Sequence, residues 1–389
     1  MLAHSPSLPL IVDYVDKDHN ITTEDEEGIT LALQRRDRVC RIRIEMPHSN
    51  LQKLIRALHD EFPMLEYLYL AASTPPHNTS LILSHTFRAP QLCHLVMRNF
   101  AFTIGSPLLL TPVGLVTLSL QQIRWPAYFP PNELLQRLSF MPQLETLTIA
   151  FSFPFPRDIA GQPSDTSIMT HVTLPNLCWF TFGGFSAYLE VVLSWITAPL
   201  LRRLEVVFFN ELNFSVPSLA QFVNKSENLR PIYAGLCIYN GGVYIFADPR
   251  KVAKAHALFI CVSRKHLNWL VAFAVQITSS LSSVFSAVDH LTLANQPLNL
   301  SPEGHNQVDR TQWHTILRSF RNVKALRIGD ELVGEISRSL QLDDEELTQE
   351  LLPELKELSY SASGDTRDSF TSFIDTRRIA GRPVKLIRH

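Results

Sequence analysis

The chain has few of the residues that mark metal, redox and nucleotide chemistry. Its 389 residues include only 5 cysteines and 14 glycines. No two cysteines form a Cys-x-x-Cys pair, no histidine–cysteine cluster has zinc spacing, and no P-loop or Gly-x-Gly-x-x-Gly sequence follows a strand-like segment. These absences argue against a zinc site and a nucleotide-binding fold, so we expect neither a metal nor a cofactor.

Sequence motifs of hydrolytic enzymes are also missing. There is no Gly-x-Ser-x-Gly motif, and the 14 histidines are scattered. His305, Asp309 and His314 could be written as metal ligands, but a loop followed by a helix starting near Thr311 is the simpler interpretation. We therefore expect no enzyme. A pocket of convergent carboxylates or histidines would favour the enzyme alternative.

The chain carries no strong charge of either sign and no long apolar run. Its 35 basic and 37 acidic residues leave a formal charge of −2, which gives no reason to expect nucleic acid. The longest apolar run, Trp269–Val275, is too short to span a bilayer, and no signal-peptide pattern opens the chain. Unpaired cysteines are typical of a reducing compartment. We expect a cytoplasmic or nuclear protein that binds neither membrane nor nucleic acid.

What the sequence does contain is one phrase, repeated ten times. In MPQLETLTI, Met141–Ile149, a proline stands two residues before the first of three apolar positions, and the other two follow three and five residues after the first. Six copies carry the proline. The first apolar positions are Val39, Leu65, Leu92, Leu115, Leu144, Leu177, Leu201, Val288, Val323 and Leu355.

The spacing inside the phrase predicts a strand. The last two apolar positions are two residues apart and share one face of an extended chain, while the first lies at the bend into the strand. We expect the proline to end the preceding helix and to start the chain extended. Segments between copies have helical spacing, as the stripe Leu51, Leu54, Ile55, Leu58 and Phe62 shows.

The recurrence of the phrase predicts the fold class. A strand followed by a helix or turn, repeated at intervals of about 23 to 35 residues with one longer gap, is typical of a leucine-rich-repeat solenoid. We expect an α/β solenoid with a curved parallel sheet on the concave face and helices and loops on the convex face. A doubly wound α/β sheet is the alternative, but nothing in that fold requires its strands to repeat one sequence pattern.

The gap between Leu201 and Val288 divides the chain into four predicted parts. An N-terminal cap covers residues 1–38, with a strand at Leu8–Val12 and a helix that a Thr23–Glu26 capping box opens. Repeats one to seven follow in 39–210. Degenerate repeats occupy 211–287, with a hairpin at 234–247 around an Asn-Gly-Gly turn; a separate inserted domain is the alternative. The last repeats and a C-terminal cap fill 288–389.

Several phrases resemble a known family. They are FMPQLETL, LPLIVDYVD, VFFNELNFSVPSLAQF, LLPELKELSY, FTSFIDTRR and AGRPVKL. Together they are similar to the leucine-rich-repeat region of fungal, basidiomycete-type F-box proteins. The resemblance implies a substrate-recognition part of an SCF-type ubiquitin ligase, in which an F-box docks on the Skp adaptor of a cullin ligase and the repeats hold the substrate. We expect the F-box to be missing from this chain, so Skp and cullin are expected partners only if an F-box is present elsewhere.

The residues between the buried strand positions are the candidate binding site. In leucine-rich repeats these positions point to the concave face, and the first three copies place basic and aromatic side chains there. The candidates are Arg41, Arg43, Tyr67, Tyr69, His94 and Arg98, with Trp179 and Arg203 on later copies. Arginine and tyrosine are enriched at interface centres, and arginine suits carboxylate and phosphate.

We therefore expect a non-enzymatic domain that binds a protein or peptide, acidic or phosphorylated. Two alternatives stay open. The same residues also suit any exposed strand surface, and the chain could be a structural or degenerate repeat remnant that binds partners without recruiting a ligase.

Overall fold

The structure of the chain is a computed structural model that divides into two compact units. Unit 1 comprises Met1–Gly184 and Val191–Leu201, and unit 2 comprises Phe185–Glu190 and Arg202–His389. The structure describes residues 8–16, 21–73, 81–101, 104–110, 114–124, 127–152, 170–209, 215–239, 242–248, 257–263, 267–295, 310–341, 351–361 and 368–389. The two central residues of the predicted hairpin turn, 240 and 241, lie outside these ranges.

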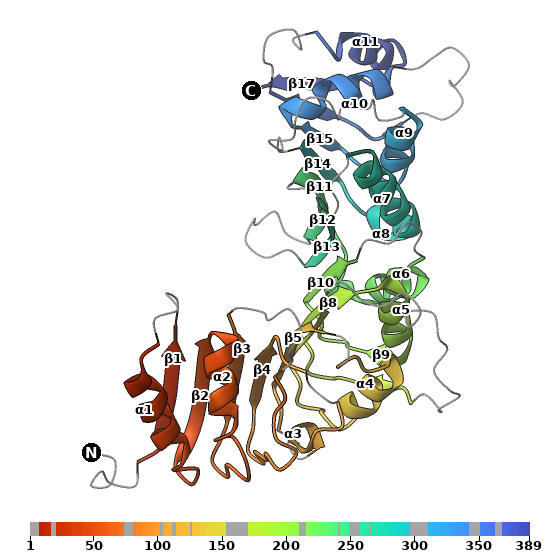
Figure 1. Cartoon of the computed structure of the whole chain (residues 1–389). Coiled ribbons are helices and arrows are strands. Elements are labelled where there is room, and N and C mark those ends of the chain that lie inside the picture. The colour runs from red at the N-terminus through yellow and green to blue at the C-terminus, as the bar shows by residue number, and fades with distance from the viewer. Residues whose placement is uncertain are drawn as a thin grey trace. The chain divides into compact units, whose positions relative to one another are not determined.

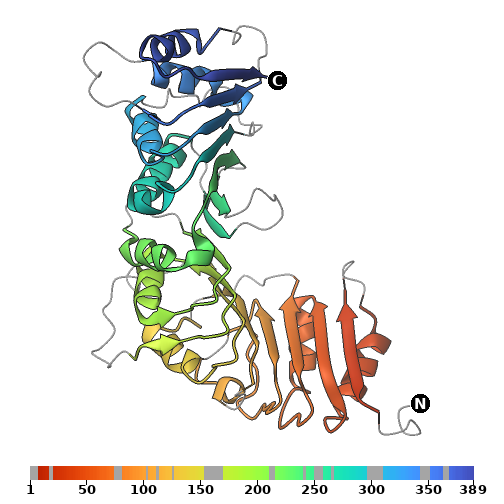
Figure 2. The ribbon, with the colours of Figure 1, turned by 180° about the vertical axis from the view of Figure 1, so that it is seen from behind.

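Unit 1 is built on parallel strands with helices on one face. The strands lie in the order β1 (Leu10–Val15), β2 (Val39–Met46), β3 (Tyr67–Ala72), β4 (His94–Arg98), β5 (Thr117–Ile123), β6 (Thr146–Phe151) and β8 (Trp179–Gly184). The helices are α1 (Thr23–Leu33), α2 (His48–Ile55), α3 (Pro107–Leu110) and α4 (Pro131–Leu138). Figures 1 and 2 show α1 and α2 together on the same side of the strands.

Two short elements complete this part of the chain. The two-residue strands β7 (Val172–Thr173) and β9 (Ile196–Thr197) pair with each other in parallel, apart from the large sheet. Helix α5 (Ser186–Trp195) contributes residues to both units.

Alternation along each strand explains the layering. In β2, Ile42 and Ile44 are fully buried, and the residue between them is not. The same holds across the repeats, since all three apolar positions of all ten copies are buried. Strand side chains alternate between faces, so one face of the sheet packs against the helices and the other stays open. The predicted helical stripe from Leu51 to Phe62 is also buried.

The repeated proline occupies a β-turn, and the prediction of an extended chain at this position is wrong. In the second copy the amide of Leu65 donates to the carbonyl of Phe62 at 3.2 Å, with Pro63 in between. The same turn recurs at other proline copies, where Leu92 donates to Ala89 and Leu144 to Met141. Proline has the φ angle that the second position of such a turn needs. In each of these copies, a β-turn at the proline therefore precedes the strand.

Asn99 makes a contact between neighbouring repeats that the repeated phrase does not predict. Its side-chain amide donates to the carbonyl of Ala72 at 2.9 Å, and its own backbone has φ of +61°. Asparagine tolerates this left-handed conformation better than most residues. The buried amide satisfies a carbonyl at the end of the preceding strand β3.

Unit 2 repeats the arrangement with one interruption. Its strands lie in the order β10 (Arg203–Phe208), β13 (Leu258–Ser263), β12 (Gly242–Asp248), β11 (Tyr233–Tyr239), β14 (His290–Asn295), β15 (Ala325–Ile328), β16 (Glu357–Tyr360) and β17 (Lys385–Arg388). The helices are α6 (Pro217–Lys225), η3 (Glu227–Leu229), α7 (Leu267–Ser280), α8 (Ser282–Phe285), α9 (Arg310–Arg318), η5 (Asp330–Leu332), α10 (Val333–Leu340) and α11 (Thr371–Ile379).

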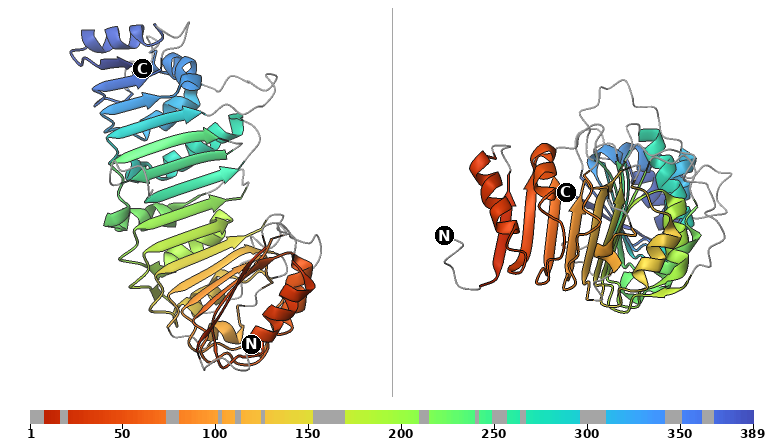
Figure 3. Two further views of the ribbon diagram at one scale, coloured as in Figure 1. Left: turned by 90° about the vertical axis from the view of Figure 1, so that its left-hand side faces the viewer. Right: turned by 60° about the horizontal axis from the view of Figure 1, so that its bottom comes forward.

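The interruption is a single reversed strand. β12 pairs antiparallel with β11 on one side and with β13 on the other, whereas β10 with β13 and β11 with β14 are parallel pairs. Strands β11 and β12 form the hairpin that the Asn-Gly-Gly signal predicts, and both lie in the large sheet. The strands of this unit run side by side in Figure 3. The described residues thus form an α/β structure with a large, mostly parallel sheet of fifteen strands.

Two predicted boundaries need correction. The first strand is Leu10–Val15, not Leu8–Val12, because it extends in register with β2 as far as Glu45. The capping box is formed by Thr22 and Asp25, not by Thr23 and Glu26. Both pairs have the same spacing, but Glu26 is engaged by Asn50 and Lys53 of α2.

Candidate functional site

The six candidate residues on the first repeats lie together on the open face of unit 1. We name this surface the Arg–Tyr face; it consists of Arg41, Arg43, Tyr67, Tyr69, His94 and Arg98. The register of the parallel strands sets the neighbours: Arg41 pairs with Tyr67, and Tyr67 pairs with His94. Arg43 pairs with Tyr69 in the next row. The even spacing of parallel pairing therefore turns repeated sequence positions into rows of adjacent side chains.

The first row is a continuous chain of contacts across four strands. The guanidinium of Arg41 lies 4.4 Å from the ring centroid of Tyr67. The rings of Tyr67 and His94 are 5.9 Å apart, and Nδ1 of His94 is 3.0 Å from the hydroxyl of Thr117. Stacking on Tyr67 orients Arg41 while leaving its N–H groups at the edge of the plane available to a ligand.

The second row is partly neutralised by acidic neighbours. The guanidinium of Arg43 lies 5.8 Å from the Tyr69 ring centroid and 3.7 Å from the carboxylate of Asp13 on β1. The Tyr69 hydroxyl donates to Glu45 at 2.9 Å. Asp13 was not among the predicted site residues, because the predicted first strand ended at Val12. The face is consequently less basic than its arginines alone indicate.

Burial raises the pKa of the Tyr69 hydroxyl. Its hydrogen bond to Glu45 and the negative charge of Glu45 raise the pKa further, while Arg98 and Arg43 oppose the shift. A raised pKa favours the protonated phenol, so Tyr69 remains a neutral hydrogen-bond donor to Glu45 at physiological pH.

Arg41 and Arg98 are the two arginines of the face that keep their charge uncompensated. Both are exposed, and neither makes an ion pair within the described residues. Arg98 lies at the end of β4, where it pairs with Ala71 on one side and Gln121 on the other.

The remaining two candidates are Trp179, on a later strand of unit 1, and Arg203, in unit 2. Trp179 begins β8 and pairs with Thr146, so it occupies the same row as His94 but three strands further along, about 14 Å away at ordinary strand spacing. Its side chain is 39% exposed. Arg203 belongs to unit 2, and its Nε donates to Glu205 at 2.7 Å.

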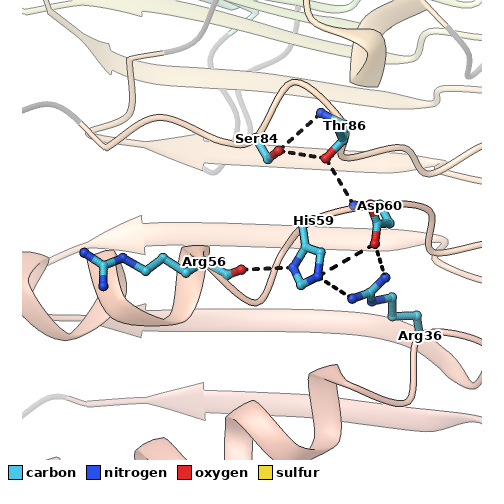
Figure 4. Close-up of polar contacts among 6 residues, drawn as sticks. All are labelled: Arg36, Arg56, His59, Asp60, Ser84 and Thr86. Atoms are coloured by element: carbon cyan, nitrogen blue, oxygen red, sulfur yellow. Dashed lines mark hydrogen bonds and ion pairs between the residues drawn. The ribbon is translucent and has the colours of Figure 1, made fainter.

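A second polar cluster ties three successive loops of unit 1 together (Figure 4). The guanidinium of Arg36 lies 2.5 Å from the Asp60 carboxylate and 2.6 Å from Nε2 of His59. The other ring nitrogen, Nδ1, is 2.9 Å from the carbonyl of Arg56. Nδ1 must then carry the proton, and Nε2 accepts from Arg36.

This geometry does not fit a catalytic triad. The hydroxyl of Ser84 contacts Thr86 at 2.8 Å, and neither contacts His59. With both ring nitrogens of His59 occupied and no nucleophile beside it among the described residues, the cluster serves to join repeats. Its signal in the sequence was weak, because it depends on Asp60 holding a left-handed backbone with φ of +62°.

Of the three residues that could be written as metal ligands, only His314 lies in the described chain. His305 and Asp309 lie outside the described residues. His314 is buried on α9, with Nε2 2.6 Å from the carbonyl of Ser339. Across the residues with assigned positions, no three histidine, cysteine, aspartate or glutamate side chains gather as metal ligands. Among the same residues, no helix has the length and apolar character needed to cross a membrane.

Comparison with known proteins assigns no family to the chain. No protein-family model matches the sequence, and no curated protein matches it significantly.

Proposed function

We propose that this chain is a leucine-rich-repeat solenoid whose open, concave sheet face binds a protein or peptide carrying acidic or phosphorylated groups. The observation that supports this most directly is the register of β2, β3 and β4, which gathers the Arg–Tyr face from three separate repeats. Function rests on binding and requires no enzymatic step.

The chemistry of the face favours an anionic ligand. Arg41 and Arg98 have no carboxylate of their own among the described residues, and each can hold a carboxylate or phosphate through paired N–H groups. Hydrogen bonds to charged groups contribute roughly 1.5–3 kcal/mol each. Tyr67 and His94 add two aromatic rings, tilted by 47° to each other, beside Arg41. A peptide that crosses the strands can therefore place one acidic group on each arginine.

The resemblance to fungal F-box proteins suggests that the bound protein is a substrate for ubiquitination. We propose that the repeats select a substrate for an SCF-type ubiquitin ligase, joined to Skp and cullin through an F-box supplied elsewhere. Five free cysteines fit a reducing, intracellular compartment, cytoplasmic or nuclear.

One observation favours the alternative of a structural repeat remnant. Asp13 and Glu45 already engage Arg43 and Tyr69, so the second row of the face is satisfied without any ligand. The two hypotheses differ in whether Arg41 and Arg98 contribute to binding.

A peptide array tests the proposed binding. The full chain is applied to matched peptides that are acidic, phosphorylated, neutral or basic, and we expect it to retain the acidic and phosphorylated ones. The double variant Arg41→Glu and Arg98→Glu should lose this retention because it reverses both free charges. Retention should also weaken at high salt, since exposed charges are screened.

The control for this experiment has the same change of charge elsewhere in unit 1. Arg35→Glu and Arg56→Glu alter exposed residues at the ends of α1 and α2, on the helical side. If both double variants bind alike, the Arg–Tyr face is not the binding site.

Affinity purification followed by mass spectrometry tests the proposed ligase role. Skp and cullin should be recovered with the full-length protein if an F-box accompanies the repeats. Recovery of a stable partner without Skp or cullin would indicate binding without ligase recruitment.

A further inference from the structure

The helical side of unit 2 contains a cavity lined only by serine, threonine and arginine. It is lined by residues from the last turn of α7, the short helix α8 and the end of α9, helices that lie near one another in Figure 1. Its volume is about 470 Å³. No aspartate or glutamate contributes to the lining within the described chain. Cavities of this size accommodate small organic ligands.

Three hydroxyl groups of the lining have a hydrogen free to donate. Ser283 accepts from the side-chain amide of Asn224 at 2.7 Å, so its own O–H hydrogen is unused. The hydroxyls of Ser279 and Ser282 make no hydrogen bond within the described residues. By contrast, the hydroxyls of Thr315 and Ser319 already donate to backbone carbonyls one turn back.

Two arginines add positive charge to the same lining. Arg318 and Arg321 are both exposed, and neither makes an ion pair with any residue that the structure describes. Arg318 ends α9, where a cation is favourable for any helix. Arg321 lies beyond the helix end, so that general preference does not account for it.

We propose that this cavity binds the phosphate group of a small phosphorylated molecule. A phosphate monoester presents three acceptor oxygens and a charge of about −1.5 to −2 at neutral pH. The three free hydroxyls and the two guanidinium groups supply matching donors and two positive charges. The volume of the cavity exceeds that of a bare anion, which favours a monoester over inorganic phosphate.

This site is independent of the Arg–Tyr face. It belongs to unit 2 and to helices, whereas the proposed peptide site belongs to the open strand face of unit 1. Loss of one activity therefore leaves the other measurable.

Isothermal titration of the full chain tests the phosphate site. The probes are glycerol phosphate, inorganic phosphate and glycerol. We expect glycerol phosphate to bind, inorganic phosphate to bind more weakly, and glycerol not to bind. Equal binding of both phosphates would still support the site and would identify the bare anion as sufficient.

Variants locate the binding. Arg318→Gln and Arg321→Gln together should weaken glycerol phosphate binding by about tenfold for each arginine. Ser282→Ala should cause a smaller loss. Arg327→Gln is the matched control, because Arg327 is an exposed arginine of the same unit on strand β15. Circular dichroism verifies that each variant is folded. Absence of phosphate binding to the wild type, or equal losses in Arg327→Gln and the double variant, would overturn the proposal.

Discussion

Single residues decide where each repeat turns. The recurring proline marks the start of each repeat in the sequence, but the predicted extended chain is wrong, because a residue with fixed φ suits a turn as well as an extended start. Asn99 could not be predicted, because its value depends on the neighbouring strand end at Ala72 and on a left-handed backbone.

Replacement of Asn99 separates these two contributions. Asn99→Ala loses the hydrogen bond to Ala72. It also puts alanine, which tolerates a left-handed backbone less well than asparagine, at φ of +61°. Together these effects should destabilise the protein by roughly 2 kcal/mol. Asn99→Gly loses only the hydrogen bond and should cost about 1 kcal/mol. Urea unfolding measures both. Equal losses for the two variants would show that the backbone conformation contributes nothing.

At the scale of single elements, the strands and helices were the most predictable features of the structure. The spacing of apolar residues is a local property, and it correctly indicated the strands and the buried residues of α2. The predicted helical stripe, however, continues to Phe62, whereas α2 ends at Ile55. Caps were less predictable, since Thr22–Asp25 and Thr23–Glu26 have the same spacing and tertiary contacts chose between them. The antiparallel direction of β12 agrees with the Asn-Gly-Gly signal in the sequence, since so short a connection joins only antiparallel strands.

The hairpin depends on a glycine that leaves room for an aromatic ring. A Cβ added to Gly235 on β11 would lie 2.0 Å from Phe246 of β12, so Gly235→Ala must displace the ring and should destabilise the protein by about 1–3 kcal/mol. Gly28→Ala is the control: it meets nothing within 4 Å inside α1 and should stabilise by about 0.5–1 kcal/mol. Thermal unfolding distinguishes the two. A neutral Gly235→Ala would contradict this packing.

The contact between α1 and α2 makes stability depend on pH. The side-chain amide of Asn50 is the main cause of a lowered pKa at Glu26, with Lys53 assisting and partial burial opposing. A lowered pKa in the folded state gives stability that is complete above the unfolded value of 4.5 and is lost as the pH falls through the folded value.

Glu26→Gln should therefore flatten the acid limb of the melting temperature against pH. Glu27→Gln, a change at an exposed neighbour on the same helix, should leave that limb as in the wild type. Superimposable curves for all three proteins would show that Glu26 does not link the two helices.

At the scale of the whole molecule, neighbouring parallel strands place the corresponding residues of the repeated phrase side by side on one surface. The Arg–Tyr face was predictable because parallel strands in even register place equal sequence positions side by side. Its neutralising partners were not, since Asp13 comes from a strand outside the repeated phrase. The cavity between α7, α8 and α9 was also out of reach, because its serines and arginines belong to segments that meet only after folding.

The proposed function requires an acidic group on a partner to bind Arg41 or Arg98 of unit 1. A double-mutant cycle tests it directly, with an acidic peptide retained by the array, its acidic residue changed to the amide, and Arg98→Gln or Arg41→Gln in the protein. Affinities of the four combinations give the coupling free energy for each arginine. We predict a coupling of about 1 kcal/mol or more for at least one arginine. Additive effects at both arginines would contradict the account.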